Sequence, residues 1–296
     1  MVTMDPIERT LERAVGRLTG DGCPPALRDA IAYAVFPAGH RFRPRLTVAV
    51  ADALGGADHS LVLSAAAAVE LLHCASLVQD DLPSFDAADE RRGRPALHRA
   101  FGEALAVLAA DALIIGAFDL LGQAGVRHPE RAARLVTEIA RGVGSPHGAV
   151  AGQAWESESA IDLVQYHRTK TAALFESATA AGAIAAGQDA GSWRTVGFWL
   201  GRAYQIADDI ADEGDGALAG SDAALGRPNA LRALGAHASA ATLDDCIDRA
   251  LEAIPPCGGQ RRFRAMLEGI LQQFRVPAAR SRDLPRAAGH LARALA

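Results

Sequence analysis

Two groups of aspartates carry the chemistry that this sequence can support, and each follows an apolar stretch with helical spacing. The groups are Asp80, Asp81 and Asp86, and then Asp208, Asp209 and Asp212. Carboxylates clustered at the end of a buried helix repel one another and take up protons unless cations neutralise them. In the second group Asp208 and Asp212 are four residues apart, which puts their Cβ atoms about 5–6 Å apart on one helical face. Each group therefore predicts a cation site.

Mg²⁺ is the cation that these side chains suit best. It takes oxygen ligands at about 2.0–2.1 Å and shares one or two carboxylates with water and phosphate oxygens. Between the two groups in sequence are side chains that bind phosphate, namely Arg91, Arg92, Lys170 and Thr171. The sequence thus predicts a diphosphate held through metal ions between two helices that face each other across a cavity.

Helical spacing of apolar residues recurs along the whole chain and predicts the elements that position these groups. The predicted helices are 6–18, 26–35, 46–54, 60–80, 101–122, 129–143, 149–157, 162–186, 197–211, 242–254, 259–274 and 284–295. Segment 87–95 is predicted to be a loop that ends at Gly93 and Pro95. The stretch 101–121 is the most apolar, but acidic residues interrupt it, so it is predicted to be a buried helix and not a membrane span.

Composition favours one all-α domain spanning residues 1–296. Half of the 296 residues are apolar and only 5% are aromatic, with Ala and Leu prominent, so helices are favoured throughout. A chain of this length would suggest about two domains. However, no Pro/Gly/Ser linker divides it, and no alternating β-branched run is long enough to predict a strand. We expect about ten or more helices around a central cavity.

Charge and cysteine content exclude several classes of function. The net charge of −5 argues against a nucleic-acid partner, because phosphate backbones select basic surfaces. The four cysteines are scattered and form no Cys-x-x-Cys pair, which indicates neither a zinc site nor a disulfide scaffold and favours the reducing cytoplasm. Residues 1–18 are too charged for a signal peptide. Lys170 is the sole lysine of the chain.

Five segments, in order, resemble the motifs of the trans-isoprenyl diphosphate synthases. The first resembles Gly-Gly-Lys-Arg-x-Arg-Pro, and the others resemble the first aspartate-rich motif in its bacterial form, the paired-arginine motif, the Lys-Thr motif and the second aspartate-rich motif with its preceding glutamine. These segments are 38–44, 80–86, 91–93, 170–171 and 204–212. Any one motif alone would be a weak signal, but five in the expected order make chance resemblance improbable.

The resemblance implies head-to-tail condensation of isopentenyl diphosphate with an allylic diphosphate, dependent on up to three Mg²⁺ ions. It implies metal binding by Asp80, Asp81, Asp86, Asp208 and Asp212, with Asp209 beside them in the catalytic group. It implies that isopentenyl diphosphate is bound by His40, Arg43, His73 and Arg92. It implies that Arg91 contacts the allylic diphosphate, and that the allylic cation and leaving group are flanked by Lys170, Thr171 and Gln205. Family members are generally homodimers.

Product length is implied by small residues on the helix before the first aspartate group. Ala75 lies five residues before Asp80, about 7.5 Å along the axis at a rise of ~1.5 Å per residue. In the family an aromatic residue here closes the cavity at fifteen carbons, and a small residue leaves room for twenty. Ala75 and Ser76 therefore favour geranylgeranyl diphosphate. Ala75 could instead serve close helix packing, and Leu72 could set the cavity floor.

The sequence also departs from the family. His40 stands where the first motif usually has lysine, and segment 212–227 lacks the lysine that usually follows the second aspartate motif, with Arg227 as a possible replacement. A lone helical histidine such as His73 is more often part of a core than a ligand-binding group. Segment 152–159 resembles the photosynthetic-bacterial geranylgeranyl diphosphate synthases of the carotenoid pathway.

Three alternatives stay open at this stage. A farnesyl diphosphate synthase would share every motif and differ only in the cavity floor. A non-catalytic regulatory subunit would keep the fold, although such proteins usually lose an aspartate motif and both are intact here. A terpene cyclase would share the metal chemistry but would not need Arg43, His73 or the arginine pair. The exact product, the preferred allylic primer and the oligomeric state are left undetermined.

Overall fold

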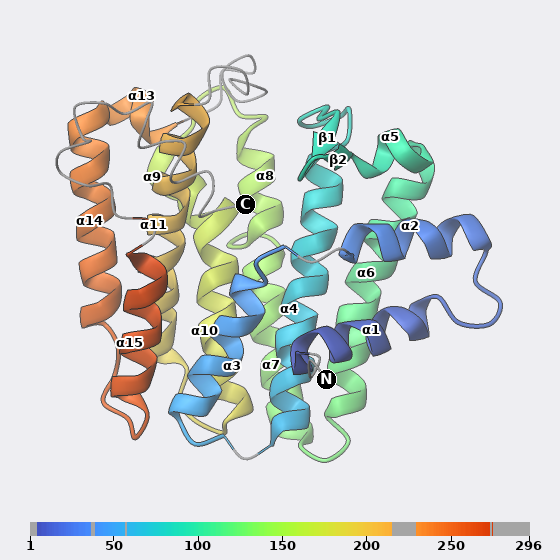
Figure 1. Ribbon diagram of the computed structural model, residues 1–296, viewed down its shortest axis with the longest axis horizontal. Coiled ribbons are helices and arrows are strands. Elements are labelled where there is room, and N and C mark those ends of the chain that lie inside the picture. Colours follow the sequence, from blue (N-terminus) through green and yellow to red (C-terminus); the bar gives the residue numbers. More distant parts are fainter. Residues whose placement is uncertain (1–4, 37–38, 57, 215–228, 273, 275–296) are drawn as a thin grey trace. The chain divides into compact units, whose positions relative to one another are not determined.

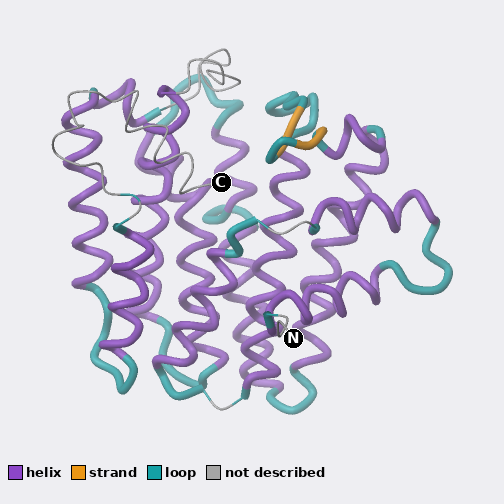
Figure 2. The backbone as a smooth tube through the Cα atoms, in the orientation of Figure 1, coloured by secondary structure: helices purple, strands orange, loops and turns teal. Residues whose placement is uncertain are grey.

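The structure is a computed structural model that describes residues 5–36, 39–56, 58–214, 229–272 and 274. Its contacts divide the chain into two compact units. The first unit comprises residues 1–139 and 181–188, and the second comprises 140–180 and 189–296. Both are helical, as Figure 2 shows by its predominantly purple tube. The all-α class predicted from the sequence is therefore confirmed.

The first unit begins with helices whose ends follow from local sequence. Its helices are α1 (Pro6–Leu18), α2 (Pro25–Val35), α3 (Phe42–Ala53), α4 (His59–Asp80), α5 (Leu97–Phe101) and α6 (Glu103–Ala124), followed by the start of α7 (Pro129–Val143). Asp5 caps α1 by accepting from the Ile7 N–H at 2.8 Å, and Pro6 occupies the first turn, where its missing N–H costs nothing. Asp58 caps α4 by accepting from the N–H groups of Ser60 and Leu61.

Helix α4 forms the core of this unit and lies beside α6 (Figure 1). Ala65 to Ala68 are all fully buried, because small side chains let neighbouring helices approach closely. Helix α6 differs from the prediction for 101–121, since only one of its faces is buried within the chain. Ala106, Leu113 and Ala117 are inaccessible, whereas Ile115 is 68% exposed.

Both α4 and α6 are long and apolar enough to cross a membrane by length and composition alone. The most apolar window of α4 is 78% buried inside the protein, and that of α6 is 44% buried. Burial within the chain gives α4 the environment that its composition requires.

A two-stranded antiparallel hairpin occupies part of the segment predicted to be loop. Its strands are β1 (Glu90–Arg91) and β2 (Arg94–Pro95), drawn in orange in Figure 2. The connecting residues Arg92 and Gly93 both have positive φ, 56° and 71°, as a tight two-residue hairpin requires. The expectation of no strand was thus wrong at this point, because turn geometry rather than alternation forms the pairing.

The second unit contains the remaining helices. They are the end of α7, then α8 (Ala149–Trp155), α9 (Leu163–His167), the π-helical turn η1 (Arg168–Ala172), α10 (Ala173–Ala185, which continues into the first unit), α11 (Gly191–Gly214), α13 (Ala230–Leu234), α14 (Ala236–Glu252) and α15 (Gln260–Leu271). The single helix predicted for 162–186 therefore contains a wide turn. The helix predicted for 284–295 lies outside the described residues.

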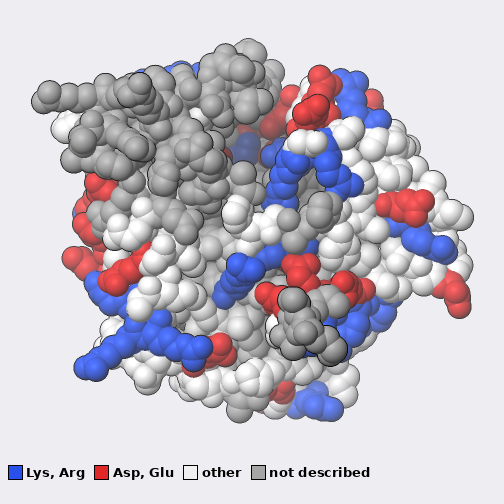
Figure 3. All heavy atoms as spheres, viewed as in Figure 1, with Lys and Arg blue, Asp and Glu red and all other residues white. Residues whose placement is uncertain are grey.

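Helices α11 and α14 pack side by side in this unit (Figure 1). The contact is apolar at its centre, where Leu200, Ile206, Leu243 and Ile247 are all nearly or fully inaccessible. On the face shown in Figure 3, acidic and basic side chains are interspersed among uncharged ones.

Candidate functional site

The first aspartate group sits on a tight turn where α4 ends. Asp80 is the last residue of α4 and Asp81 is its C-terminal cap. The chain then folds back, so that the Asp86 N–H donates to the Asp80 carbonyl at 2.9 Å and the Ala88 N–H donates to the Asp81 carbonyl at 3.2 Å. Asp80 and Asp86 are half-buried, and Asp81 is buried. The two residues inserted before Asp86 thus form a loop that keeps all three aspartates together.

The hairpin delivers Arg91 to this group. Its Nε donates to Asp81 Oδ1 at 3.0 Å, and a second guanidinium nitrogen contacts the same oxygen. Burial raises the pKa of Asp81, and the guanidinium of Arg91 opposes that rise. A charge-assisted contact of this kind keeps a buried carboxylate ionised that would otherwise bind a proton.

A cationic group lies in the same unit, on the loop that starts α3 and on α4. Arg43 is buried and its Nη1 donates to His73 Nε2 at 3.2 Å. Since guanidinium can only donate, this nitrogen of His73 must carry a lone pair. Burial, and secondarily the positive charges of Arg43 and Arg92, place the pKa of His73 well below its ordinary value. His73 is therefore neutral at pH 7.

Arg92 closes this group from the hairpin side. A Cβ added to Gly39 would lie 2.5 Å from the Arg92 guanidinium, so Arg92 packs against the backbone just before His40. His40 is exposed. The first unit thus brings together the residues that the resemblance assigned to isopentenyl diphosphate, His40, Arg43, His73 and Arg92.

Arg41, which lies between His40 and Arg43, has a role that was not predicted from the sequence. Its side chain is buried and donates to Glu8 at 2.8 Å, to Glu70 at 2.7 Å and to the Val35 carbonyl at 2.8 Å. Its own backbone is left-handed, with φ of 50°, and it precedes α3. Arg41 therefore anchors the loop from below, which fixes the position of Arg43. The sequence signal that could have predicted this role is Glu70, an acidic residue within the apolar stretch that forms α4.

The residues predicted to control product length lie on α4, one to two turns before Asp80. Leu72 and Ala75 are both 1% exposed, and Ser76 is half-buried. The Ser76 hydroxyl donates to the His73 carbonyl at 2.8 Å. Leu72 and Ala75 are thus packed inside the first unit, and their role in product length stays a prediction.

In the second unit the wide turn η1 places Lys170 and Thr171 in separate hydrogen-bond networks. Lys170 forms an ion pair with Glu156. The Thr171 hydroxyl donates to Gln205 Oε1, and Gln205 Nε2 donates to Asp209 Oδ1 at 2.8 Å. π-Turns are rare and occur frequently at functional sites.

Asp209 is fixed by neutral donors. Its Oδ2 accepts from the Ala230 N–H at 2.6 Å, and its backbone carbonyl accepts from Asn229 Nδ2 at 3.2 Å. It is 3% exposed, whereas Asp208 is half-buried. The two adjacent aspartates therefore have different environments. The side chain of Asp212 and residue Arg227 lie outside the described residues.

His167 lies 3.5 Å from the Asp209 carboxylate, measured from its Nε2 to Oδ2. Burial, followed by the charges of Arg202 and Lys170, lowers the pKa of His167 to about 4. His167 is therefore neutral at pH 7. It was not predicted from the sequence.

The donor chemistry at both groups fits Mg²⁺. Within the described part of the chain, no three His, Cys, Asp or Glu side chains come together as a complete metal cage. Mg²⁺ bound through one or two carboxylates, with phosphate oxygens and water completing the octahedron, needs no such cage. Half-buried Asp80, Asp86 and Asp208 supply hard oxygen ligands of the required kind.

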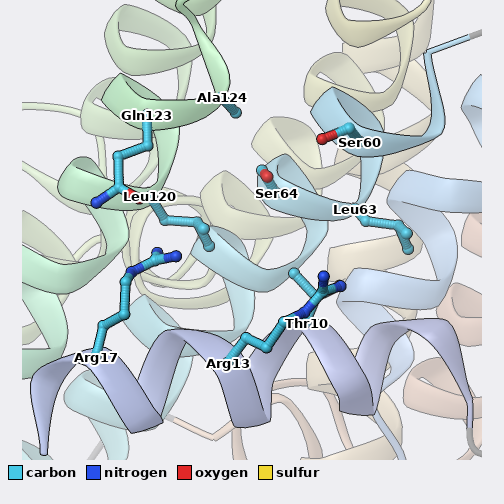
Figure 4. A pocket seen from close by; sticks show the side chains of 9 residues that line it. All are labelled: Thr10, Arg13, Arg17, Ser60, Leu63, Ser64, Leu120, Gln123 and Ala124. Carbon is cyan, nitrogen blue, oxygen red and sulfur yellow. The ribbon is translucent and has the colours of Figure 1, made fainter. Parts of the chain in front are cut away.

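A separate pocket of about 240 Å³ lies between α1, α4 and α6 in the first unit. Figure 4 shows Arg13 and Arg17 rising from α1 toward it, with Ser60 and Ser64 on α4. None of the residues predicted to bind substrate or metal lines it.

Comparisons with known proteins agree with these features. The model of the polyprenyl synthetase family matches residues 24–252. Geranylgeranyl diphosphate synthase of Cereibacter sphaeroides is 46% identical over 277 residues, covering 92% of this chain and 96% of that protein. The enzyme of the same name from Rhodobacter capsulatus is 45% identical over 267 residues, covering 88% and 92%. The crystal structure of an FPP/GFPP synthase from Zymomonas mobilis superposes with a TM-score of 0.78 at 28% identity, covering 90% and 96%.

Proposed function

The chain belongs to the polyprenyl synthetase family and is a trans-prenyltransferase, and from this premise we propose that it makes geranylgeranyl diphosphate. The observation that carries the proposal is Ala75, a small buried side chain on α4 five residues before Asp80. Support comes from two relatives of that name that are 45–46% identical over most of both chains. The substrates would be isopentenyl diphosphate and an allylic diphosphate.

Mg²⁺ ions, up to three, would be held by Asp80, Asp81, Asp86, Asp208 and Asp212, and would supply neutralisation of the charge that develops on the leaving diphosphate. The turn that gathers Asp80 and Asp86 and the half-buried position of Asp208 support this assignment.

The cationic group would bind isopentenyl diphosphate. Arg43 and Arg92 offer guanidinium forks that match phosphate oxygens. His73, being neutral and accepting from Arg43, orients that guanidinium and can itself offer a second ring nitrogen. His40 is placed at the exposed edge, where a diphosphate would enter.

The remaining residues would act on the allylic substrate. Arg91 would contact its diphosphate, and Lys170, Thr171 and Gln205 would flank the cation and the leaving group, with Asp209 fixing Gln205. The allylic C–O bond breaks with its electron pair leaving on the diphosphate. The isopentenyl double bond then attacks the cation, and a proton is lost to the released diphosphate. Apolar helix walls exclude the water that would quench the cation.

The product assay tests this directly. Purified protein is incubated with Mg²⁺, labelled isopentenyl diphosphate and each allylic primer, and the products are sized by chromatography. We expect a twenty-carbon product, and Ala75→Tyr should shorten it by one isoprene unit, with Ala75→Gly as the matched control. A fifteen-carbon main product would favour a farnesyl diphosphate synthase, and no condensation would favour a regulatory subunit.

We also propose a cytoplasmic homodimer. On α6 the apolar side chains Val107, Leu108 and Ile115 are 45%, 51% and 68% exposed, and such a surface would be stabilised by a second copy of this chain. The double variant Leu108→Asp, Ile115→Asp should yield monomers in analytical ultracentrifugation, while the wild type sediments as a dimer. A monomeric wild type would refute the proposal.

A further inference from the structure

Glu156 is a half-buried acidic residue that the proposed reaction does not use. It directly follows α8 and lies in segment 152–159, which resembles the photosynthetic-bacterial geranylgeranyl diphosphate synthases. Its side chain is 9% exposed. An isolated carboxylate at this depth would be strongly disfavoured in its charged form. Its partners therefore decide what it does.

Side chains from α8, α9 and η1, within the described part of the chain, contact the Glu156 carboxylate. The Lys170 ammonium contacts Oε1, and the Tyr166 hydroxyl donates to the same oxygen at 2.6 Å. Gln153 Nε2 donates to Oε2 at 3.0 Å. This carboxylate is thus fixed by neighbours on both sides, and its negative charge is compensated by Lys170.

The backbone holds the end of α8, which carries Glu156, close to Lys170. A Cβ on Gly152 would collide with the backbone of Lys170, so α8 and η1 are in direct main-chain contact at this point. Any side chain larger than hydrogen at position 152 would separate them. The Lys170–Glu156 contact is consequently set by rigid elements and not by two flexible side chains meeting in solvent.

Lys170 must serve two anions if it also binds a diphosphate. An ammonium has three N–H donors, so it can contact Glu156 and a phosphate oxygen at once. Each anion then weakens the hold of the other, because both draw on one positive charge. The carboxylate also repels an incoming diphosphate at short range.

We infer that Glu156 is a positioning residue that orients the Lys170 ammonium and lowers the affinity of the site for diphosphate, so that the leaving group is released after transfer. The inference rests on the proposed function, in which Lys170 binds the diphosphate. It assigns a role to an acidic side chain outside both aspartate groups.

The test measures binding of inorganic diphosphate in the presence of Mg²⁺ by calorimetry. Glu156→Gln keeps the size of the side chain and an oxygen that can accept from Tyr166, but removes the charge. We expect its Kd for diphosphate to fall about 5- to 10-fold, as for loss of one partly screened charge contact. The value of kcat should fall while KM for the allylic substrate also falls, because release of diphosphate slows.

Asp245→Asn is the matched control. It removes one negative charge from the same unit at an exposed pair with Arg249, and should leave the diphosphate Kd within about twofold, since exposed pairs contribute little. Glu156→Asp provides a second variant in case Glu156→Gln does not fold. It retains the charge but retracts it from Lys170, and its Kd should lie between those of Glu156→Gln and the wild type.

The Lys170→Gln variant tests the role of Lys170 in diphosphate binding separately from the role of Glu156. If Lys170→Gln weakens diphosphate binding but neither Glu156 variant strengthens it, the role of Glu156 is refuted and the proposed function stands. If Lys170→Gln leaves the Kd unchanged, both the assigned role of Lys170 and the inference on Glu156 are overturned. In the double variant, the effect of Glu156→Gln should disappear, as expected for coupled residues.

Discussion

The two aspartate groups look alike in sequence, but the structure holds their second members in different ways. Asp81 is paired with a guanidinium that reaches it from a hairpin. Asp209 is fixed by the Ala230 N–H and the Gln205 amide, both neutral. A carboxylate held by one charged partner can exchange that partner for a cation. One that accepts from a backbone N–H and a neutral amide gains nothing by such an exchange, so we expect Asp81 and Asp209 to differ in function.

The first test of this comparison replaces one half-buried aspartate in each group. Asp80→Asn and Asp208→Asn should each lower kcat by at least about 100-fold, because several kcal/mol of charge stabilisation depend on the metal ligands. Steady-state assays at saturating Mg²⁺ measure this. Asp89→Asn is the control in the same loop as Asp80, since Asp89 is exposed and paired with Arg99, and should retain near wild-type kcat.

A smaller effect is expected from the guanidinium that holds Asp81. Arg91→Gln should lower kcat/KM for the allylic substrate roughly 10-fold, because both the diphosphate and Asp81 lose a bidentate partner. Arg91→Lys should recover only part of this loss. Equal activity of Arg91→Gln and the wild type would show that the Asp81–Arg91 contact is structural only.

Replacing Asp209 should affect the stability of the protein more than its activity. In Asp209→Asn one of two acceptor oxygens becomes a donor, which leaves either the Ala230 N–H or the Gln205 amide without a partner. We expect a loss of about 1–3 kcal/mol in the free energy of unfolding, measured by urea denaturation. Asp208→Asn should lose less stability and more activity, and the reverse order would contradict the distinction between the two residues.

Asp58 lies outside both aspartate groups and is a reference for how much a carboxylate that accepts backbone hydrogen bonds contributes to the free energy of unfolding. Like Asp209 it accepts from backbone N–H, here at the start of α4, and the bond from Leu61 is the main cause that lowers its pKa below 3.8. Because the folded pKa is the lower one, the stabilisation is complete above 3.8 and is lost as the pH falls through the folded pKa. Asp58→Ala should cost about 1 kcal/mol at pH 7, and the difference from wild type should shrink at pH 3.

Much of this arrangement was predictable because it depends on local patterns. Helical spacing placed α1 and α7 at their observed bounds, and the order of the motifs identified the residues gathered around His73. The hydrogen-bond and ion-pair partners of individual side chains were not predictable, because they depend on tertiary contacts. Arg41 and Arg43 are two residues apart in one basic loop, yet the first is buried against Glu70 and the second reaches His73. Likewise nothing in the spacing of Glu156 and Lys170 indicates an ion pair across fourteen positions.

The wide turn from Arg168 to Ala172 has a consequence for anyone who redesigns this protein. An α-helix advances 100° per residue, and a π-turn accommodates one residue more than the regular path. A helical wheel drawn from Leu163 to Ala185 is therefore out of phase on one side of the turn. Deleting one residue there would restore a regular helix and keep the following face in place, whereas deleting one residue elsewhere in the helix would rotate that face by about 100°.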